Sequence, residues 1–513
     1  MGKVKFVAPI LAGMAALLLL VGAGQAVDSS SDYLHWPSAD AKYATIDGKH
    51  IWQNVKEQAD IAEHYRDNGH PQFWGRLAGT SSDVEDTQWL LNKYKQIGLT
   101  DTRLQTINLF NPQWSAQGWD VTAALGDEIV PLASAEPAYG SADTSGKTLN
   151  LEVVYVGLAS EADFGGRDVR GKAVLFVKAQ PSYQAGPADI LKRIEDHGAA
   201  AILSTDMRGG NFNAQSYRAY THVPTFNIGT KDSEALRKMI GSAATPLHVR
   251  IHLTANWLEN QKSYLVWGTL PGATDETIYV IAHRDGFFDA AGDNATGVAT
   301  MLGLAEYFAK IPKSQRRRTM IFIGMDGHHN IKPGGFGREW LVANRDKFFS
   351  KTALMINAEH PAEVLSHGGT AGTTTAAVPL EWYAGGEERP HLAKITADAF
   401  HEFGVPAWAQ PSEKPPGGDL GRFYWFVPGL VAQSNDFVNM HTAADTPDNV
   451  PWTGLEAITR AYAKIIDDVN TIPLGELRRP ATADPNAPAT PQGYLSLANC
   501  QAWVKDSTAN CVQ

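Results

Sequence analysis

Short apolar runs alternate with amphipathic stretches along most of this 513-residue chain. Residues 51–68 and 84–97 carry apolar side chains at three- and four-residue steps, which predicts two helices with one buried face each. Runs rich in Val, Ile and Leu that stop abruptly at polar residues predict buried strands instead. Because such strands alternate with helices, the pattern predicts an α/β fold. The strands of the main domain are expected within residues 263–270, 277–283, 320–325 and 353–358.

A different pattern interrupts this one between residues 126 and 258. It contains the strand-like runs LEVVYVG, AVLFVKA and AAAILS, and a helix-like stretch from Asp189 to His197 that ends at Gly198. A smaller, β-rich α/β domain inserted into the main domain would account for this order. The chain then divides into a signal peptide, the first part of the main domain, the insertion, the second part of the main domain, and a Pro/Ala-rich linker with a short tail: 1–26, 27–125, 126–258, 259–472 and 473–513.

Residues that suit a metal ion follow the predicted strands. His283 ends one strand and Asp293 lies in the turn-rich loop after it. His329 and Glu359 follow the next two strands, and His441 begins a turn rich in Asp and Pro. Ligands collect outside the carboxyl ends of strands in α/β sheets, and imidazole with carboxylate suits zinc. One carboxylate that bridges two ions, with two further ligands on each ion, would use all five residues.

His283 and Asp293 form only a weak motif when they are taken alone. Asp293 would also serve as the N-cap of the helix expected at 298–309, in a strand–turn–helix that binds no metal. The three further segments favour the metal site over this alternative. Asp285, two residues beyond His283, is expected to accept a hydrogen bond from the other imidazole nitrogen and thereby to orient that ring.

Taken together, these segments resemble the family of zinc aminopeptidases and glutamate carboxypeptidase II, which also includes the non-enzymatic transferrin receptor. The family pattern is His-x-Asp after a strand, Asp-Asn-Ala-Ser/Thr-Gly, a paired Glu-Glu, an acidic residue after Asn-x, and a late His-Thr-x-x-Asp-Thr. Residues 283–285, 293–297, 357–359 and 441–446 match four of these motifs. The resemblance covers most of the chain.

This resemblance implies a three-layer α/β/α domain with a mixed sheet, two zinc ions, and hydrolysis of peptide or amide bonds. By position, His283 and Glu359 would hold one ion, His329 and His441 the other, and Asp293 would bridge them. The insertion resembles a protease-associated domain through its Val-Arg-Gly-Lys-Ala-Val-Leu entry and its Gly-Ala-Ala-Ala step. The implied role of that domain is a lid or a wall of the substrate site, and a purely structural insertion is the alternative.

One motif departs from the family pattern, because His328–His329 replaces the paired glutamates. The first glutamate is the family's general base, which takes a proton from the attacking water, and the second is a zinc ligand. Imidazole can take both roles, since its pKa of about 6.5 suits a base near neutrality. Asp326 is a second candidate for the base or for a partner of the site. A degenerate, non-catalytic homologue that acts in binding is the alternative, and a hydrolase or cyclase of a non-peptide amide is a third possibility.

Further positions near the site differ from the family or are less specific. Met440 stands where the family's enzymes often carry a Tyr that steadies the oxyanion. Family members carry substrate contacts in the segment that corresponds to residues 415–429. Candidate contacts or pocket-lining residues here are Asp419, Arg422, Tyr424, Trp408 and Trp425, with core packing or loop structure as the alternative for each.

The chain ends indicate an exported protein, periplasmic or extracellular. Two lysines, an apolar stretch over residues 6–21 and small residues up to Ala26 predict signal-peptide cleavage after Ala26, with an uncleaved anchor as the alternative. The chain has two cysteines, Cys500 and Cys511, which are expected to pair in an oxidising compartment; two free thiols are the alternative. A net charge of −11 argues against nucleic acid or an anionic membrane as the main partner. The expected partner is a peptide or amide substrate.

Overall fold

The computed structural model describes most of the chain between residues 38 and 478. The predicted signal peptide, both cysteines and Trp425 lie outside the described residues. Among the helices within them, none has both the length and the apolar composition needed to cross a bilayer. The described segments are 38–109, 112–178, 186–205, 210–216, 219, 221–242, 245–329, 336–362, 380–385, 389–405, 407–409, 416–424, 426–433 and 439–478.

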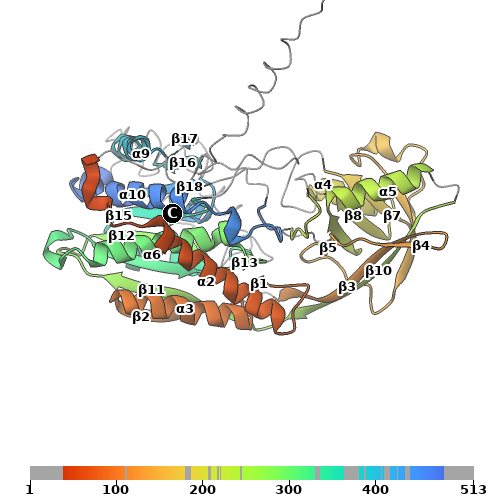
Figure 1. Cartoon of the computed structure of the whole chain (residues 1–513), viewed down its shortest axis with the longest axis horizontal. Helices are drawn as coiled ribbons and strands as arrows, with labels where there is room; N and C mark the ends of the chain where they lie inside the picture. The colour runs from red at the N-terminus through yellow and green to blue at the C-terminus, as the bar shows by residue number, and fades with distance from the viewer. Residues whose placement is uncertain are drawn as a thin grey trace, which may run out of the picture. The chain divides into compact units, whose positions relative to one another are not determined.

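A mixed sheet of eight strands forms the centre of the main domain, in the order β17-β16-β18-β15-β12-β14-β11-β2 (Figure 1). The central strands β14, β12, β15 and β18 are parallel. The pairs β14–β11, β11–β2 and β18–β16 are antiparallel, and β16 and β17 are parallel. The strands are β2 (Thr100–Asn108), β11 (Lys262–Leu270), β12 (Thr277–His283), β14 (Thr319–Met325), β15 (Thr352–Ala358), β16 (Leu380–Ala384), β17 (Ala407–Ala409) and β18 (Gly429–Gln433).

Both faces of this sheet are buried, which explains why its central strands are continuously apolar. In β12, Tyr279 and Ile281 join a core cluster with residues of the helices α7 (Phe336–Ala343) and η6 (Asp419–Arg422). Because side chains alternate along a strand, Ile278 and Val280 point to the opposite face, where they are fully buried as well. That face is covered by helices that also pack on one another: α2 (Gly48–Asp67), α3 (Ser81–Ile97), α6 (Thr296–Ala309) and α10 (Trp452–Val469).

The sheet with helices on both faces is a three-layer α/β/α domain, as the family resemblance implied. The strands β11, β12, β14 and β15 and the helices α2, α3 and α6 lie where the apolar pattern predicted them, within a few residues at each end. The remaining helices of this part are α8 (Arg345–Phe348), α9 (Pro390–Glu402), α11 (Leu474–Leu477), η1 (Ser38–Tyr43), η4 (Lys313–Gln315) and η7 (Pro447–Asn449).

A second eight-stranded sheet, in the order β4-β3-β10-β6-β7-β8-β9-β5, is built from the region of the insertion. The strand β3, which precedes the predicted start of the insertion at residue 126, pairs along its length with β10 in this sheet. The elements are β3 (Gln113–Leu125), β4 (Glu128–Pro131), β5 (Glu136–Pro137), β6 (Leu149–Tyr155), η2 (Glu161–Phe164), β7 (Ala173–Val177), α4 (Ala188–Asp196), β8 (Ala201–Thr205), β9 (Thr225–Ile228), α5 (Thr230–Ser242) and β10 (His248–Leu258).

A short antiparallel pair, β1 (Gly75–Arg76) with β13 (Gly286–Phe287), anchors the loop that follows β12. Gly75 has a φ of +144°, and a Cβ on it would lie 2.3 Å from the carbonyl oxygen of Gly286, so this pairing requires glycine. The buried guanidinium of Arg76 donates to the backbone oxygens of Arg284, Asp289 and Ala290 at 2.6–2.9 Å. These contacts fix the path of the chain from β12 towards α6.

Candidate metal centre

The parallel strands β12, β14 and β15 bring three polar segments to one edge of the main sheet. His283 at the end of β12 lies opposite Met325 of β14, and Ile281 lies opposite Asn357 of β15. The residues that follow these strands therefore emerge side by side. His441 comes to the same place on the loop that leads into η7 and α10, and has a left-handed backbone with a φ of 58°.

His283 lies beside the two predicted carboxylate ligands Asp293 and Glu359. His283 Nε2 lies 3.2 Å from Asp293 Oδ1 and 3.5 Å from Glu359 Oε1. All three residues are at least 98 % buried. Asn357 donates from Nδ2 to the other oxygen of Glu359, Oε2, at 2.6 Å, which leaves Oε1 directed towards His283.

The other oxygen of Asp293 faces a second group. Asp293 Oδ2 lies 2.9 Å from His441 Nε2 and 3.3 Å from His329 Nε2, and these two nitrogens are 3.1 Å apart. The two oxygens of Asp293 thus face different sets of imidazoles, as expected for a carboxylate that bridges two ions.

The spacing of these atoms fits zinc. Ligand bonds of about 2.0–2.1 Å in a tetrahedron separate neighbouring donor atoms by about 3.3 Å. The distances between Nε2 and carboxylate oxygens in the two groups lie between 2.9 and 3.5 Å. Each group offers imidazole nitrogen and carboxylate oxygen in a buried setting, which is the donor chemistry that zinc takes in proteins. The residues present therefore fit two zinc ions that share Asp293.

Asp285 is bound mainly to His329. Its Oδ2 accepts from the His329 backbone N–H at 2.7 Å and lies 3.2 Å from Nδ1 of the same residue, while Oδ1 accepts from the backbone N–H of His328 at 3.2 Å. His283 Nδ1 lies closer to the backbone oxygen of Asp285, at 3.1 Å, than to its carboxylate, at 3.6 Å. The carboxylate expected to orient His283 is therefore placed to orient His329, and the backbone oxygen takes the place beside His283.

Asp445 supports the loop that carries Asp293. It is buried and accepts from the backbone N–H groups of Gly292 at 2.6 Å and Asp293 at 3.1 Å. Burial raises the pKa of Asp445 to about 7, against the effect of these two hydrogen bonds.

Gly297 ends the motif that begins at Asp293. A Cβ on Gly297 would lie 2.2 Å from the backbone oxygen of Ala358, so glycine lets α6 begin beside the end of β15. Gly297 belongs to the motif at residues 293–297 and Asp445 to the motif at residues 441–446, but no role was predicted for either residue.

Charges of opposite sign stabilise one another within the cluster. Burial by itself raises the pKa of Asp293, but the imidazoles of His360 and His329 outweigh it and hold this pKa well below the ordinary range. Burial likewise disfavours the imidazolium of His329, yet Asp293 and Asp285 raise its pKa to about 9. The site is therefore built around an ionised Asp293, which is the form that binds a cation.

His328 lies over His283 at the border of the cluster. The two imidazole rings are stacked, with centroids 4.1 Å apart and 16° between their planes. His328 Nδ1 is 3.0 Å from Asp419 Oδ1, and its Nε2 is 3.9 Å from Glu359 Oε1. Asp419 also pairs with the buried Arg338. Burial lowers the pKa of His328, and the neighbouring His283 lowers it further, against the pull of Asp419.

Asp326 faces away from Asp293, into a separate network of buried charges. Its carboxylate accepts from the hydroxyl of Ser263 and from the backbone N–H of Gly327, and lies 3.7 Å from Arg284 Nη2. Arg284 in turn binds Asp83 at 2.9 Å and Asp86 at 2.7 Å. Burial raises the pKa of Asp326 well above its ordinary value, and the charge of Asp83 adds to this.

Two of the candidate substrate contacts pack within the domain. Arg422 lies 3.9 Å from Glu339, and the ring of Tyr424 packs edge-on against Tyr383 at 5.8 Å. The third, Asp419, contacts His328 as described above. The side chains of Trp408 and Trp425 lie outside the described residues.

His360 is close to the cluster and was not predicted. Its Nε2 lies 3.0 Å from Asp293 Oδ1. His360 directly follows Glu359, and this position in the sequence was the one feature that could have predicted its place in the site. A neighbour along an extended chain normally points the other way, so the adjacency alone does not predict a shared site.

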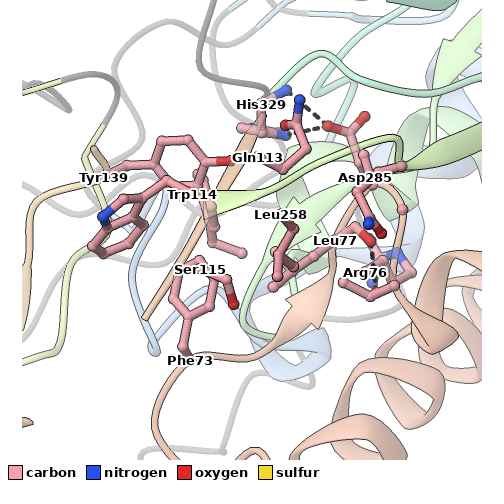
Figure 2. A pocket seen from close by; sticks show the side chains of 15 residues that line it. Phe73, Arg76, Leu77, Gln113, Trp114, Ser115, Tyr139, Leu258, Asp285 and His329 are labelled. Atoms are coloured by element: carbon pink, nitrogen blue, oxygen red, sulfur yellow. Dashed lines mark hydrogen bonds and ion pairs between the residues drawn. The ribbon is translucent and has the colours of Figure 1, made fainter. Parts of the chain in front are cut away.

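A pocket lined by aromatic side chains borders the cluster. Figure 2 shows Phe73, Trp114 and Tyr139 on one side of this pocket and Asp285 with His329 on the other. The rings continue towards the cluster through Phe287, whose centroid lies 6.0 Å from Tyr139 and 5.0 Å from His329. This pocket offers apolar surface directly beside candidate metal ligands.

A segment of the inserted region pairs with the loop of His441. The backbone N–H of Gln215 donates to the oxygen of His441 at 2.8 Å, and that of Ala443 donates to the oxygen of Asn213 at 3.0 Å. Ala214 and Thr442 form an antiparallel bridge between them. The backbone of His441 and of the two residues after it is therefore held by residues 213–215.

Comparisons with known proteins show similarity to peptidases. Residues 266–466 match the sequence model of peptidase family M28. Aminopeptidase YwaD of Bacillus subtilis (strain 168) is 25 % identical over 260 residues, 48 % of this chain and 50 % of that protein, so the match spans about half of its length.

Solved structures show the same fold at lower identity. BSAP, a zinc aminopeptidase from Bacillus subtilis, is 16 % identical with a TM-score of 0.60, covering 82 % of this chain and 94 % of that one. A peptidase M28 precursor from Shewanella amazonensis SB2B is 16 % identical with a TM-score of 0.61, covering 84 % and 97 %. An aminopeptidase from Aneurinibacillus sp. strain AM-1 is 17 % identical with a TM-score of 0.55, covering 83 % and 95 %. Residues 266–466 are thus similar in sequence to peptidase family M28, and the chain shares the fold of these proteins.

Proposed function

We propose that this protein is an exported, co-catalytic zinc peptidase that removes residues from the amino end of peptides. The proposal rests on the position of the two carboxylate oxygens of Asp293. One oxygen lies beside His283, and the other lies beside His329 and His441. Its relatives support the choice of chemistry, since they include zinc aminopeptidases. In this proposal His283 and Glu359 hold one ion, His329 and His441 hold the other, and Asp293 bridges them.

When bound, two zinc ions supply Lewis-acid polarisation of the scissile carbonyl and activation of the attacking water. The protein's own part is to hold the ligands and to move protons. Asp285 and Asn357 hold His329 and Glu359 in place. Burial of the ligands keeps bulk water away from the charges and so strengthens their interactions.

In the proposed mechanism, His328 moves the proton. If its Nδ1–H donates to Asp419, Nε2 carries the lone pair, and Nε2 lies on the side of Glu359, towards the cluster. The imidazole can then take a proton from the attacking water and deliver it to the leaving amine. Arg338 pairs with Asp419 and keeps that carboxylate ionised, so Asp419 orients His328 rather than taking its proton.

The experiment is a comparison of matched substrates with purified protein loaded with zinc. We expect release of the chromophore from aminoacyl anilides with a free amino group, and much slower release from the same compounds when that group is acetylated. Faster cleavage of the acetylated series would contradict the assignment to the amino end.

A non-catalytic, zinc-binding homologue is the second candidate. It is favoured by the loss of the family's Glu-Glu pair to His328–His329 and by Met440 in place of the usual Tyr. Under this alternative the protein would bind zinc but hydrolyse none of the free or blocked amides. A broad amide screen on protein of known zinc content therefore separates the two candidates.

A further inference from the structure

His360 is placed unusually for a residue that directly follows a predicted ligand. Its backbone has a φ of +37°, a left-handed conformation that is uncommon outside glycine. Its backbone N–H donates to Asn294 Oδ1 at 3.0 Å, which ties it to the residue after Asp293. This turn places His360 on the same side as Glu359, and its side chain is only 8 % exposed.

The imidazole of His360 lies near the carboxylates of Asp293 and Glu359, which also lie beside His283. Its Nε2 lies 3.0 Å from Asp293 Oδ1 and 3.8 Å from Glu359 Oε1. One nitrogen of His283, one oxygen of Asp293 and one nitrogen of His360 all lie within 4.8 Å of one another. These separations lie around the tetrahedral spacing of about 3.3 Å for zinc.

We propose that His360 is a ligand of the ion held by His283 and Glu359, an inference that rests on the zinc site of the proposed function. That ion would then have two imidazoles and two carboxylates from the protein. The other ion would have His329, His441 and the shared Asp293.

This assignment makes the two ions different. Four protein ligands close a zinc site, whereas catalytic zinc keeps a position open for water or substrate. The scissile carbonyl should therefore bind on the side of His329 and His441, which is also the side of the aromatic pocket.

The test uses two variants of equal reach. His360→Gln keeps a polar group near the position of Nε2 but makes a poor zinc ligand, and His360→Glu keeps the reach and supplies a carboxylate. Both retain a non-glycine residue at the left-handed position, so any backbone strain is matched. His401→Gln, at an exposed histidine of α9, is the control.

The measurements are the zinc dissociation constants, by competition with a chromophoric chelator, and the absorption spectrum of the cobalt-substituted protein. We expect His360→Gln to raise the dissociation constant of one zinc ion by more than about 100-fold. Loss of a residue that only hydrogen-bonds to a ligand usually costs less than this. The cobalt spectrum should change in the same variant. His360→Glu should recover most of the affinity, and His401→Gln should match the wild type.

An unchanged cobalt spectrum in His360→Gln would overturn the inference, whether the affinity is unchanged or falls by 10- to 100-fold, because His360 would then only be a hydrogen-bond partner of Asp293. If His360→Gln does not fold, failure of His360→Glu to keep the second ion would overturn it equally. A wild type that binds neither zinc nor cobalt would instead refute the proposed function. The two failures are thus distinguishable.

Discussion

At the scale of single residues, the exchange of two glutamates for His328 and His329 is the feature that sets this chain apart from the family pattern. It replaces an anionic ligand by a neutral one, so two bound zinc ions would retain about one more positive charge. His328 stacks on His283 and lies within hydrogen-bond distance of Asp419. In the proposed mechanism, this position lets His328 act as the base and Asp419 orient it. His328 and His329 should therefore respond differently to substitution.

We predict that His328→Ala keeps its zinc but lowers kcat by about 10²–10⁴-fold with little change in KM, the usual cost of losing a general base. His328→Glu should retain or raise activity, because it restores the family's base. His329→Ala should lose zinc together with activity. Metal analysis and steady-state kinetics on the three variants test this. An unchanged kcat in His328→Ala would show that another group is the base.

A second residue-scale prediction concerns Asp289, which lies near Asp60, Glu63, Arg66 and Arg76. Burial raises its pKa to about 7, and the charge of Glu63 adds to this effect, whereas Arg76 and Arg66 oppose it. The folded state therefore holds this proton more tightly than the unfolded chain does, where the pKa is about 3.9. Ionised Asp289 should destabilise the fold as the pH rises from about 4 to about 7.

Asp289→Asn removes this dependence. The difference in unfolding free energy between variant and wild type should be small below about pH 4 and should favour the variant by a few kcal/mol above about pH 7. Urea unfolding of both proteins across this pH range measures it. A difference that does not vary with pH would show that Asp289 titrates normally in the folded protein.

The sequence predicted that five candidate ligands would lie close together, because each follows a strand or begins a motif and parallel strands bring such positions together. His360 could not, because its direction depends on a positive φ and on the contact of its N–H with Asn294. The partner of Asp285 was predicted as His283, whereas its carboxylate is bound mainly to His329. Such choices depend on side-chain directions that neither spacing nor periodicity determines.

At the scale of elements, residues 213–215 of the inserted region hold the loop of His441 through backbone hydrogen bonds. The side chain of Gln215 holds this segment in turn, since its Nε2 donates to the backbone oxygen of Pro137 at 3.0 Å. Removal of the Gln215 N–H should therefore make the position of His441, a predicted metal ligand, less fixed, while the main sheet stays unchanged.

We predict that Gln215→Pro, which removes that N–H, weakens zinc binding and lowers kcat more than KM changes. Gln215→Ala is the matched variant, because it loses the side-chain contact but keeps the N–H, and it should stay closer to the wild type. Zinc competition assays and kinetics test the pair. Equal effects in the two variants would assign the loss to the side chain rather than to the bond with His441.

The sequence pattern predicted the central strands well, because buried parallel strands are continuously apolar and end at polar residues. The boundary of the inserted region, predicted at residue 126, stays a prediction. Strand β3 mixes exposed and buried positions and resembles either sheet in composition, so only its pairing with β10 shows where it belongs. The resemblance of that region to a protease-associated domain stays a prediction.

At the scale of the whole molecule, the predicted export and the tail disulfide concern residues outside the described segments. We expect the exported protein to begin at Val27 and to carry a bond between Cys500 and Cys511. Intact mass spectrometry with and without reduction should show the loss of residues 1–26 and a gain of two hydrogens on reduction. Two thiols that react with alkylating reagent before reduction would refute the disulfide.

The central claim is that two zinc ions sharing Asp293 make this chain a peptidase. Stepwise addition of zinc to chelator-treated protein, with hydrolysis of an aminoacyl anilide followed at each step, tests it most directly. The account predicts no hydrolysis without metal and a rise that levels off at about two equivalents of zinc per chain, with Asp293→Ala inactive throughout. Full activity in metal-free protein, or an Asp293→Ala variant that binds two ions and hydrolyses the substrate normally, would contradict it.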